Sequence, residues 1–247
     1  MFSGCSKYER LLKSSDMELK YTKGLEYYQN EKYYKAYPLI EESYAFYRGS
    51  ARAEYLYYIY AYSDYYLGDL LLAAHRFNQF TKTFPVSEYA EECAFMSAYC
   101  NYLLSPKYSL DQNSTNTALV ELQGFIRAYP TSTRVDSCTQ LIIDLEDKLE
   151  KKAYENAYVY LKTGHYRAAI KAFNNMLLDY PDNMYREDLY FYIVEAQFLL
   201  AKNSVKSKQK QRIADTRKAY TTFVSRYPES KLIPRAEGYV ANLENIK

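Results

Sequence analysis

The amino-acid sequence predicts an all-α protein in which helix pairs stack into a solenoid. Three observations indicate this class. A segment that ends in an aromatic residue and proline recurs along the chain. Glycine and proline, which punctuate the many turns of sheet proteins, number only seven each among 247 residues. Apolar residues recur at three- and four-residue spacing, as on one face of a helix, over long stretches of the chain.

Four segments share the same ending: FTKTFP at residues 80–85, FIRAYP at 125–130, MLLDYP at 176–181 and FVSRYP at 223–228. Two positions after each proline comes a residue whose side-chain oxygen can accept a helix amide, namely Ser87, Ser132, Asn183 or Ser230. Each segment is therefore predicted to be a helix that stops at the aromatic–proline pair and is followed by a newly capped helix.

Positions upstream of these prolines repeat as well. A glycine is expected to end the first helix of a pair in the left-handed conformation, and an alanine lets the second helix approach the first. Larger residues follow on one helical face. The two full copies are Gly68, Ala73, Phe77, Phe80, Pro85 and Gly164, Ala169, Phe173, Met176, Pro181; the shorter copies are Ala118, Leu122, Phe125, Pro130 and Thr216, Tyr220, Phe223, Pro228; a degenerate first copy is Gly24, Tyr27, Tyr33, Ala36, Ile40. This is the pattern of the tetratricopeptide repeat, about 34 residues long. We predict a right-handed superhelical solenoid of about five such helix pairs.

Departures from the period define the expected domain organisation. Residues 105–116 and the lysine-rich residues 203–211 exceed the repeat length and are predicted to be surface loops. Residues 133–163 contain neither glycine nor proline and keep a helical apolar spacing, which predicts one long central helix. We therefore divide the chain into an N-terminal anchor and linker (1–15), a front module with repeats one to three (16–131), a connecting helix that overlaps repeat four (132–163) and a rear module with the remainder of repeat four, repeat five and a capping helix (164–247).

The residues give little support to catalysis or to nucleic-acid binding. Lys and Arg number 32 against 30 Asp and Glu, without the basic excess that nucleic-acid partners require. The two histidines, His75 and His165, accompany no metal-binding spacing, and no phosphate-binding glycine loop occurs. Cys93 and Cys100 are separated by about 10 Å of helix rise, too far for a disulfide, and are expected to be buried thiols together with Cys138. We expect no enzyme activity, no metal and no cofactor.

The chain is unusually rich in tyrosine, with 32 Tyr, 11 Phe and no Trp. In solenoids of this type the first helix of each pair lines the concave surface. Rings with hydroxyl tips on that surface can bury apolar side chains of an extended peptide and bond to its backbone. Two other interpretations stay open, an idle tyrosine-rich surface and a carbohydrate site. The predicted peptide-binding groove consists of Tyr21, Tyr28, Tyr55, Tyr58, Tyr62, Tyr65, Tyr66, Phe95, Tyr99 and Tyr102, with Leu25 beside them; the rear module is less aromatic there, with Tyr154, Tyr158, Tyr190 and Gln197.

The first residues, Phe2-Ser3-Gly4-Cys5, have the form of a lipoprotein processing box, in which the cysteine receives the lipid. An export signal carries a basic start and an apolar stretch before such a box. Only Met1 and Phe2 precede it in this sequence. The residues alone leave two interpretations open, a clipped lipoprotein start and an accidental match.

Taken together, several segments resemble the BamD family, the outer-membrane protein assembly lipoproteins of Gram-negative bacteria. The resemblance covers nearly the whole chain. It rests on the start CSKYE at residues 5–9, the four aromatic–proline ends, SPKYSLDQ at 105–112, KLEKK at 148–152 and the stretch from YPDN to YRED at 180–188.

The resemblance implies a periplasmic protein held at the outer membrane by lipid on Cys5, with no other membrane contact. It implies that the front repeats bind unfolded β-barrel clients and that the rear repeats dock on the barrel-forming insertase subunit. For that docking we expect an interface around Tyr190, Lys206, Lys208 and Lys210. Two alternatives are a glycan-capturing surface lipoprotein and a periplasmic scaffold for envelope or cell-wall enzymes.

Overall fold

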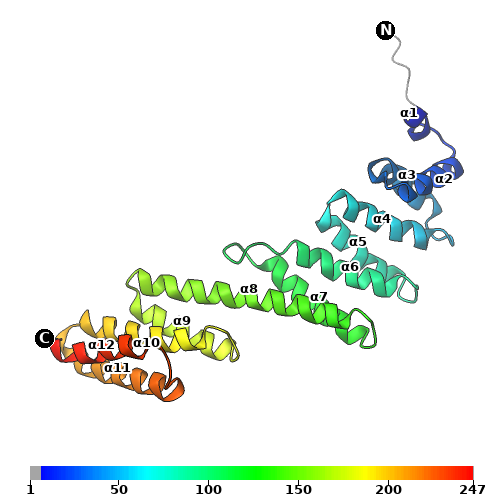
Figure 1. Cartoon of the computed structure of the whole chain (residues 1–247). Coiled ribbons are helices and arrows are strands. Elements are labelled where there is room, and N and C mark those ends of the chain that lie inside the picture. The colour runs from blue at the N-terminus through cyan, green and yellow to red at the C-terminus, as the bar shows by residue number, and fades with distance from the viewer. Residues whose placement is uncertain (1–6, 247) are drawn as a thin grey trace, which may run out of the picture. The chain divides into compact units, whose positions relative to one another are not determined.

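A computed structural model describes residues 7–246, so the predicted lipidation site Cys5 lies outside the described residues. Residues 7–246 form twelve α-helices and a closing 3₁₀ turn, without a strand (Figure 1). The elements are α1 (Lys7–Leu12), α2 (Met17–Gln29), α3 (Tyr33–Tyr47), α4 (Ala53–Leu67), α5 (Leu70–Thr83), α6 (Ala90–Leu103), α7 (Asn113–Ala128), α8 (Val135–Lys162), α9 (Tyr166–Asp179), α10 (Arg186–Lys202), α11 (Lys206–Arg226), α12 (Ile233–Ala241) and η1 (Asn242–Asn245). The predicted all-α class of consecutive, tetratricopeptide-like helix pairs is confirmed.

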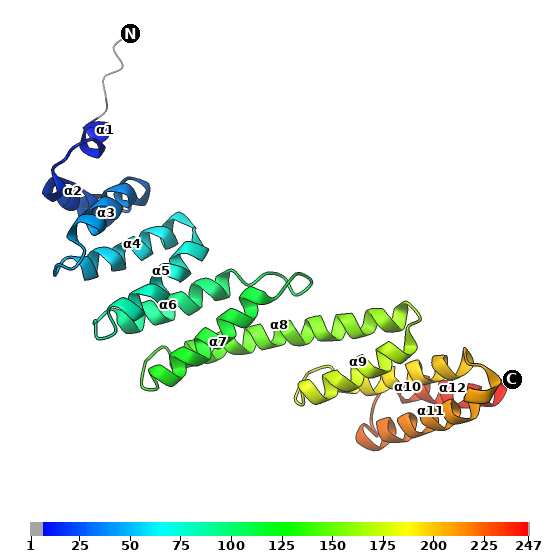
Figure 2. The same cartoon turned by 180° about the vertical axis from the view of Figure 1, so that it is seen from behind.

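The chain forms two compact units, and the boundary between Leu145 and Glu146 falls inside α8. In the first unit α2 packs on α3, α4 on α5 and α6 on α7, with neighbouring pairs in contact (Figure 2). Leu145 and Cys138 of α8 join the core of this unit. In the second unit the remainder of α8 packs with α9 and α10 through Ala157 and Leu161, and α11 and α12 complete the unit. The single long helix predicted for residues 133–163 is α8.

Glycine marks two of the predicted helix–helix turns. Gly68, with φ of 84°, follows α4, and Gly164, with φ of 79°, follows α8. Both occupy the left-handed region, which side chains disfavour. The glycine of the first repeat serves another purpose. Gly24 lies inside α2, where an added Cβ would come 3.3 Å from the Cβ of Leu39 in α3, so its small size permits close packing of the two helices.

The residues two positions after each proline bond to the start of the next helix, but not as the N-caps that the sequence predicts. Ser87 Oγ accepts the amide of Tyr89 at 3.0 Å, and α6 begins only at Ala90. The hydroxyl also donates to Glu54 of α4 at 2.5 Å. The same pair of bonds recurs later in the chain, with Ser132 donating to Glu91 and Ser230 to Glu187. These side chains therefore fasten each turn to the preceding repeat.

The two predicted insertions have different structures. Residues 104–112 form a loop around Gln112, whose amide donates to the carbonyls of Lys107 and Leu110. Residues 206–211, by contrast, are the first turns of α11, so the second predicted loop is mostly helical. The prediction was wrong because Lys, Gln and Arg have high helix propensity and no glycine or proline interrupts them. Arg212 also reaches back to the hydroxyl of Ser204 and anchors the turn.

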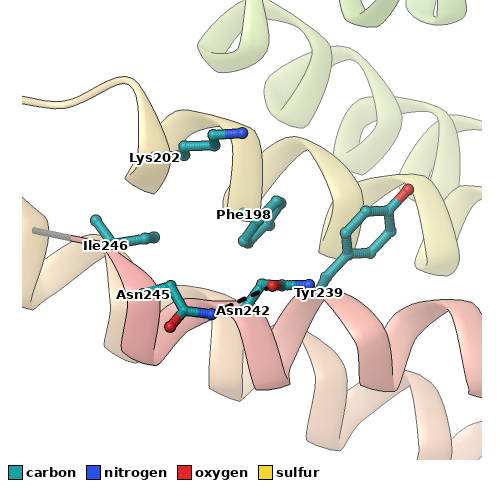
Figure 3. Close-up of a pocket in the computed structure, with 6 residues that line it drawn as sticks. All are labelled: Phe198, Lys202, Tyr239, Asn242, Asn245 and Ile246. Atoms are coloured by element: carbon teal, nitrogen blue, oxygen red, sulfur yellow. Dashed lines mark hydrogen bonds between the residues drawn. The ribbon is translucent and has the colours of Figure 1, made fainter.

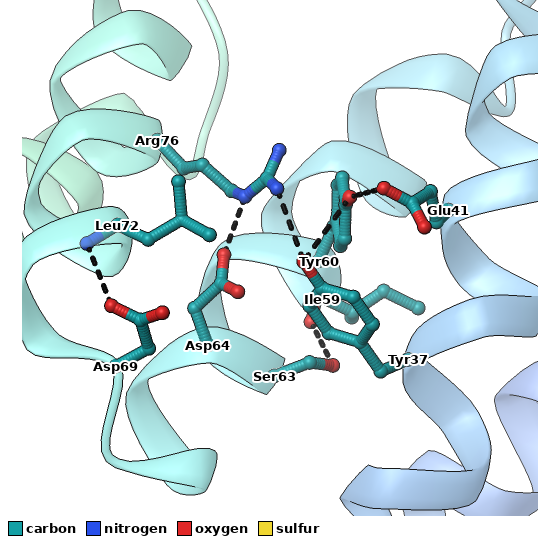
Figure 4. Close-up of polar contacts among 9 residues, drawn as sticks. All are labelled: Tyr37, Glu41, Ile59, Tyr60, Ser63, Asp64, Asp69, Leu72 and Arg76. Atoms are coloured by element: carbon teal, nitrogen blue, oxygen red, sulfur yellow. Dashed lines mark hydrogen bonds and ion pairs between the residues drawn. The ribbon is translucent and has the colours of Figure 1, made fainter.

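A buried ion pair joins α3, α4 and α5 inside the first unit (Figure 4). Arg76 Nε lies 2.5 Å from Asp64 Oδ2, and the Asp64 side chain is 2% exposed. The Arg76 guanidinium also covers the Tyr60 ring at 3.6 Å and donates to the Tyr37 hydroxyl at 3.3 Å. Tyr60 in turn donates to Glu41. Both charges therefore have polar or ionic partners, without which their burial would cost much free energy.

Candidate protein-binding surface

Aromatic rings from the first two helix pairs and from the turn before α6 form a continuous row in the first unit. We call this set the tyrosine row; it consists of Tyr28, Tyr33, Tyr55, Tyr58, Tyr62, Tyr65, Tyr66 and Tyr89. Tyr28 meets Tyr33 at 5.5 Å between ring centroids, and Tyr33 stacks on Tyr66 at 4.3 Å. Tyr66 leads to Tyr62 at 5.7 Å, and Tyr62 to Tyr58 at 4.9 Å. The row thus runs from α2 across α3 to α4.

A carboxylate of α6 organises the middle of the row. Glu92 accepts hydrogen bonds from Tyr62 at 2.6 Å and from Tyr58 at 3.2 Å. It also lies 3.5 Å from Arg134. Burial, together with the hydrogen bond to Glu92, raises the pKa of Tyr62 far above its usual range, and burial followed by the charge of Glu92 does the same for Tyr58. Both phenols are therefore neutral donors at physiological pH.

The aromatic surface continues on α6. Phe95 stacks on Tyr99 at 5.7 Å, and Tyr99 stacks on Tyr102 at 6.0 Å. Tyr102 donates to Asp144 of α8 at 3.3 Å. Tyr58 and Tyr62 of α4 reach this helix through their shared partner Glu92. The predicted groove residues of α4 and α6 are thus neighbours.

The predicted groove residues differ in how much of each ring faces solvent. Tyr66 is 48% exposed, whereas Tyr62 is 7% and Phe95 8% exposed. The last two rings are part of the packed core, which they fill beside Phe77 and Phe125. They support the surface from below rather than offering a face to a partner. The partly buried members are Tyr28, Tyr55, Tyr58, Tyr65, Tyr99, Tyr102 and Tyr21.

Tyr21 belongs to a separate cluster at the end of α3. Its ring lies 5.7 Å from Tyr47, and the guanidinium of Arg52 lies 4.4 Å from Tyr21 and 4.8 Å from Tyr47. Glu18 accepts from both Arg52 and Tyr47. The sequence analysis grouped Tyr21 with the other residues of the predicted groove, but the structure places its ring contacts outside the tyrosine row.

Three residues of this surface were missed by the sequence analysis. The Tyr89 ring lies 4.4 Å from the Tyr58 ring in a tilted arrangement, and the Arg134 guanidinium lies 4.4 Å from the Phe95 ring centroid. Both stand four positions after the proline of their repeat end, a spacing that the sequence displays. The third missed residue is Tyr33, the first residue of α3. No repeated spacing in the sequence indicates that its ring stacks on Tyr66.

Several hydroxyls of this surface remain available to a partner. Within residues 7–246, those of Tyr65, Tyr66 and Tyr99 make no hydrogen bond to another residue. Exposed phenols of this kind combine an apolar face with a donor and an acceptor. The surface can therefore cover apolar side chains while bonding to a peptide backbone.

The second unit repeats part of this arrangement. Tyr154 stacks on Tyr185 at 4.2 Å, at the positions that Tyr58 and Tyr89 occupy in the second repeat. Tyr158 adds a contact to Tyr192 at 4.9 Å. The ring contacts of the second unit thus resemble those of the first unit more closely than the sequence analysis indicates.

The residues predicted to bind a partner subunit lie on α10 and α11. Lys206, Lys208 and Lys210 are exposed and form no ion pair with any residue from 7 to 246. Lys208 lines a pocket of about 400 Å³ beside Arg167 and Arg212, and Tyr190 lines a neighbouring pocket of about 280 Å³. Both pockets share Gln197 and Asp215, so Tyr190 and Lys208 border one continuous region of the second unit, whereas Lys206 and Lys210 line neither pocket.

A third pocket of the second unit, of about 420 Å³, lies between α10 and the end of α12 (Figure 3). Phe198 and Tyr239 face each other there with ring centroids 5.2 Å apart. Lys202 and Asn242 stand at its edge. Asn242 already donates to the Gly238 carbonyl, so much of its polar capacity is used within the fold.

Comparison with known protein families gives one decisive match. The family described as YfiO, outer membrane lipoprotein, matches residues 13–212, which is most of the chain. The chain belongs to the YfiO family. The matched residues of this YfiO protein include the whole tyrosine row and the lysine-bearing start of α11. Membership supports a location at the outer membrane and membrane-associated protein–protein interactions.

Two findings on the described part of this YfiO protein bear on the site. Among residues 7–246 no helix combines the length and apolar character needed to cross a bilayer. Within the same residues no group of three or more His, Cys, Asp or Glu is placed to hold a metal ion.

Proposed function

We propose that this YfiO-family protein is a non-enzymatic assembly factor for outer-membrane β-barrel proteins, with a role like that of BamD. In this proposal the tyrosine row and α6 bind segments of unfolded barrel clients. The second unit docks on the insertase subunit, a barrel with periplasmic domains. Lipid on Cys5 holds the protein to the periplasmic face of the outer membrane.

The tyrosine row is the observation that carries the proposal. Strands of membrane barrels alternate apolar and polar residues and carry aromatic residues near the membrane interfaces. Such an extended segment offers rings on one side and unpaired backbone groups along its length. Tyr66 is exposed and Tyr99 is partly exposed, and neither hydroxyl bonds to another residue within 7–246, which suits both features.

A peptide titration tests the client site. We expect a peptide of alternating aromatic residues to bind the full chain and to lose at least about tenfold in affinity when Tyr65, Tyr66 and Tyr99 are changed to Ala. Tyrosine is enriched among interface hot spots, and truncating one hot spot costs about 2 kcal/mol or more. Tyr160→Ala is the matched control, since Tyr160 is 44% exposed and lies outside the row. Absence of binding, or equal binding by the triple variant, would reject this assignment. Binding of oligosaccharides instead of peptides would favour the glycan-capturing alternative.

Co-purification tests the second unit. The native protein is expected to bring down a barrel protein with periplasmic domains. Lys208→Glu should weaken that complex, whereas Lys231→Glu, an exposed charge reversal at a different site of the second unit, should not. Recovery of cell-wall enzymes alone would instead support the scaffold alternative.

A further inference from the structure

A buried lysine fastens the short first helix to the first repeat. Lys20 of α2 is only 3% exposed. Its ammonium donates to the carbonyl of Leu12, the last residue of α1, at 2.8 Å and forms an ion pair with Glu42 of α3. One cation thus joins three helices. A buried ammonium is retained only where such partners offset its desolvation.

An aromatic contact fixes the other end of α1. The Tyr8 hydroxyl donates to the Lys35 carbonyl of α3 at 3.0 Å, and the Tyr8 ring meets Tyr27 edge-on at 5.7 Å. The Lys35 ammonium lies 5.5 Å from the Tyr8 centroid, 5.8 Å from that of Tyr27 and 5.6 Å from that of Tyr34. Three rings therefore surround this cation, which is a favourable arrangement. Detachment of α1 would remove the Tyr8 ring from it.

The chain between the predicted lipid and α1 is very short. Only Ser6 separates Cys5 from Lys7, the first residue of α1. Two residue steps span at most about 7 Å. A lipid on Cys5 would therefore bring α1 to the headgroup layer. The exposed residues of α1 and its last turn include Lys7, Arg10 and Lys13 against one carboxylate, Glu9, a charge balance that favours anionic lipid.

We propose that α1 is an orienting latch: held by Lys20 and Tyr8, it fixes the first repeat against the headgroups of an anionic lipid surface. This inference rests on the lipid anchor of the proposed function. Without this latch, a lipid on Cys5 would hold the protein at the membrane but would not fix the orientation of the first repeat. With it, the start of the tyrosine row in α2 is kept at a defined height above the membrane.

Hydrogen exchange of the full, unlipidated chain tests the latch itself. In Lys20→Met we expect the amides of residues 11–14 to exchange at least about tenfold faster than in the wild type, because a bond from a charged donor is lost. Glu42 is 42% exposed and stays solvated after this change, which limits wider damage. Lys23→Met is the control, since within residues 7–246 the ammonium of Lys23 pairs with Glu26 of the same helix and with no other carboxylate. Unchanged exchange in Lys20→Met would overturn the latch.

Energy transfer from a donor at Lys82→Cys in α5 to acceptor lipids tests the orientation. The lipidated protein on vesicles of phosphatidylglycerol and phosphatidylethanolamine should give a narrow distance distribution, which Lys20→Met and Tyr8→Ala broaden. Phosphatidylcholine vesicles should also broaden it. Equal distributions for all variants would overturn the orienting role even if α1 loosens. If mass spectrometry of the native protein shows no lipid on Cys5, the anchoring in the proposed function fails, and so does the membrane part of this inference. Hydrogen exchange would still show whether Lys20 holds α1 on the first repeat.

Discussion

The phenol of Tyr62 donates a 2.6 Å hydrogen bond to the carboxylate of Glu92, a residue 30 positions away in the next helix pair. This bond connects α4 with α6 beneath the exposed rings. The Tyr62 ring is buried, so its hydroxyl has little access to water as a substitute partner. Glu92 therefore both stabilises the first unit and orients the tyrosine row.

Glu92→Leu is expected to destabilise the first unit by about 1–3 kcal/mol, because it leaves the buried hydroxyl of Tyr62 without an acceptor. Tyr62→Phe combined with Glu92→Leu should cost less than Glu92→Leu alone, since both polar partners are then absent. Urea unfolding of the four members of this cycle measures the coupling. Additive effects would contradict the role assigned to the bond.

Arg76→Met is expected to cost about 3–5 kcal/mol, because Asp64 would remain as an uncompensated buried charge. Changing Asp64 to Leu in the same chain should recover much of the loss. Thermal and urea unfolding report both values. A double variant as unstable as Arg76→Met would show that the pair acts through packing on Tyr60 instead.

Two helical glycines of the first unit should respond in opposite directions to alanine. Gly24→Ala places a Cβ 3.3 Å from that of Leu39, and overpacking of this kind costs about 1–3 kcal/mol. Gly124→Ala meets nothing nearer than the Arg127 side chain at 4.0 Å, so we expect a gain of about 0.5–1 kcal/mol from helix propensity. An unfolding midpoint that rises in Gly24→Ala, as it should in Gly124→Ala, would refute the close approach of α2 and α3.

Alkaline pH should weaken the fold. Burial raises the pKa of Cys100 to about 12, and burial also raises the pKa values of Tyr28 and Tyr62 well above 10.0. In the unfolded chain these groups lose their protons near pH 8.5–10, about their ordinary pKa values, while the folded chain keeps them. The stability is therefore fully present below about pH 8.5 and falls as the pH rises through 10 toward the folded pKa values. Unfolding at pH 8, 9 and 10, with phenolate absorbance of the native protein, measures this. Phenolate absorbance of the native protein at pH 10 as large as that of the unfolded chain would contradict it.

Cys93, Cys100 and Cys138 should resist thiol reagents in the native state. All three are buried, and burial raises the pKa of each thiol. Because the thiolate is the reactive form, we expect modification at pH 8 only after unfolding. A colourimetric thiol assay with and without denaturant gives the count. Rapid labelling of any of the three in the folded protein would show local opening of α6 or α8.

The sequence by itself determined the elements that depend on local chemistry. Gly68 and Gly164 end helices because their backbone conformation disfavours side chains, and that requirement is visible in the residue type. The aromatic–proline ends and the uninterrupted apolar spacing of α8 are likewise local signals. The lysine-rich start of α11 was the exception, since repeat length predicted a loop where helix propensity produced a helix.

Only the tertiary structure decided which tyrosines form a surface. All turns of α4 carry rings, so its sequence does not reveal that Tyr62 is buried while Tyr66 is exposed. That difference arises from α5 and α6, whose Phe77 and Glu92 enclose one ring and leave the other free. The latch at Lys20 has the same origin, because its partners Leu12 and Glu42 come from separate helices. Burial and pairing depend on residues far apart in the chain, which helix periodicity does not encode.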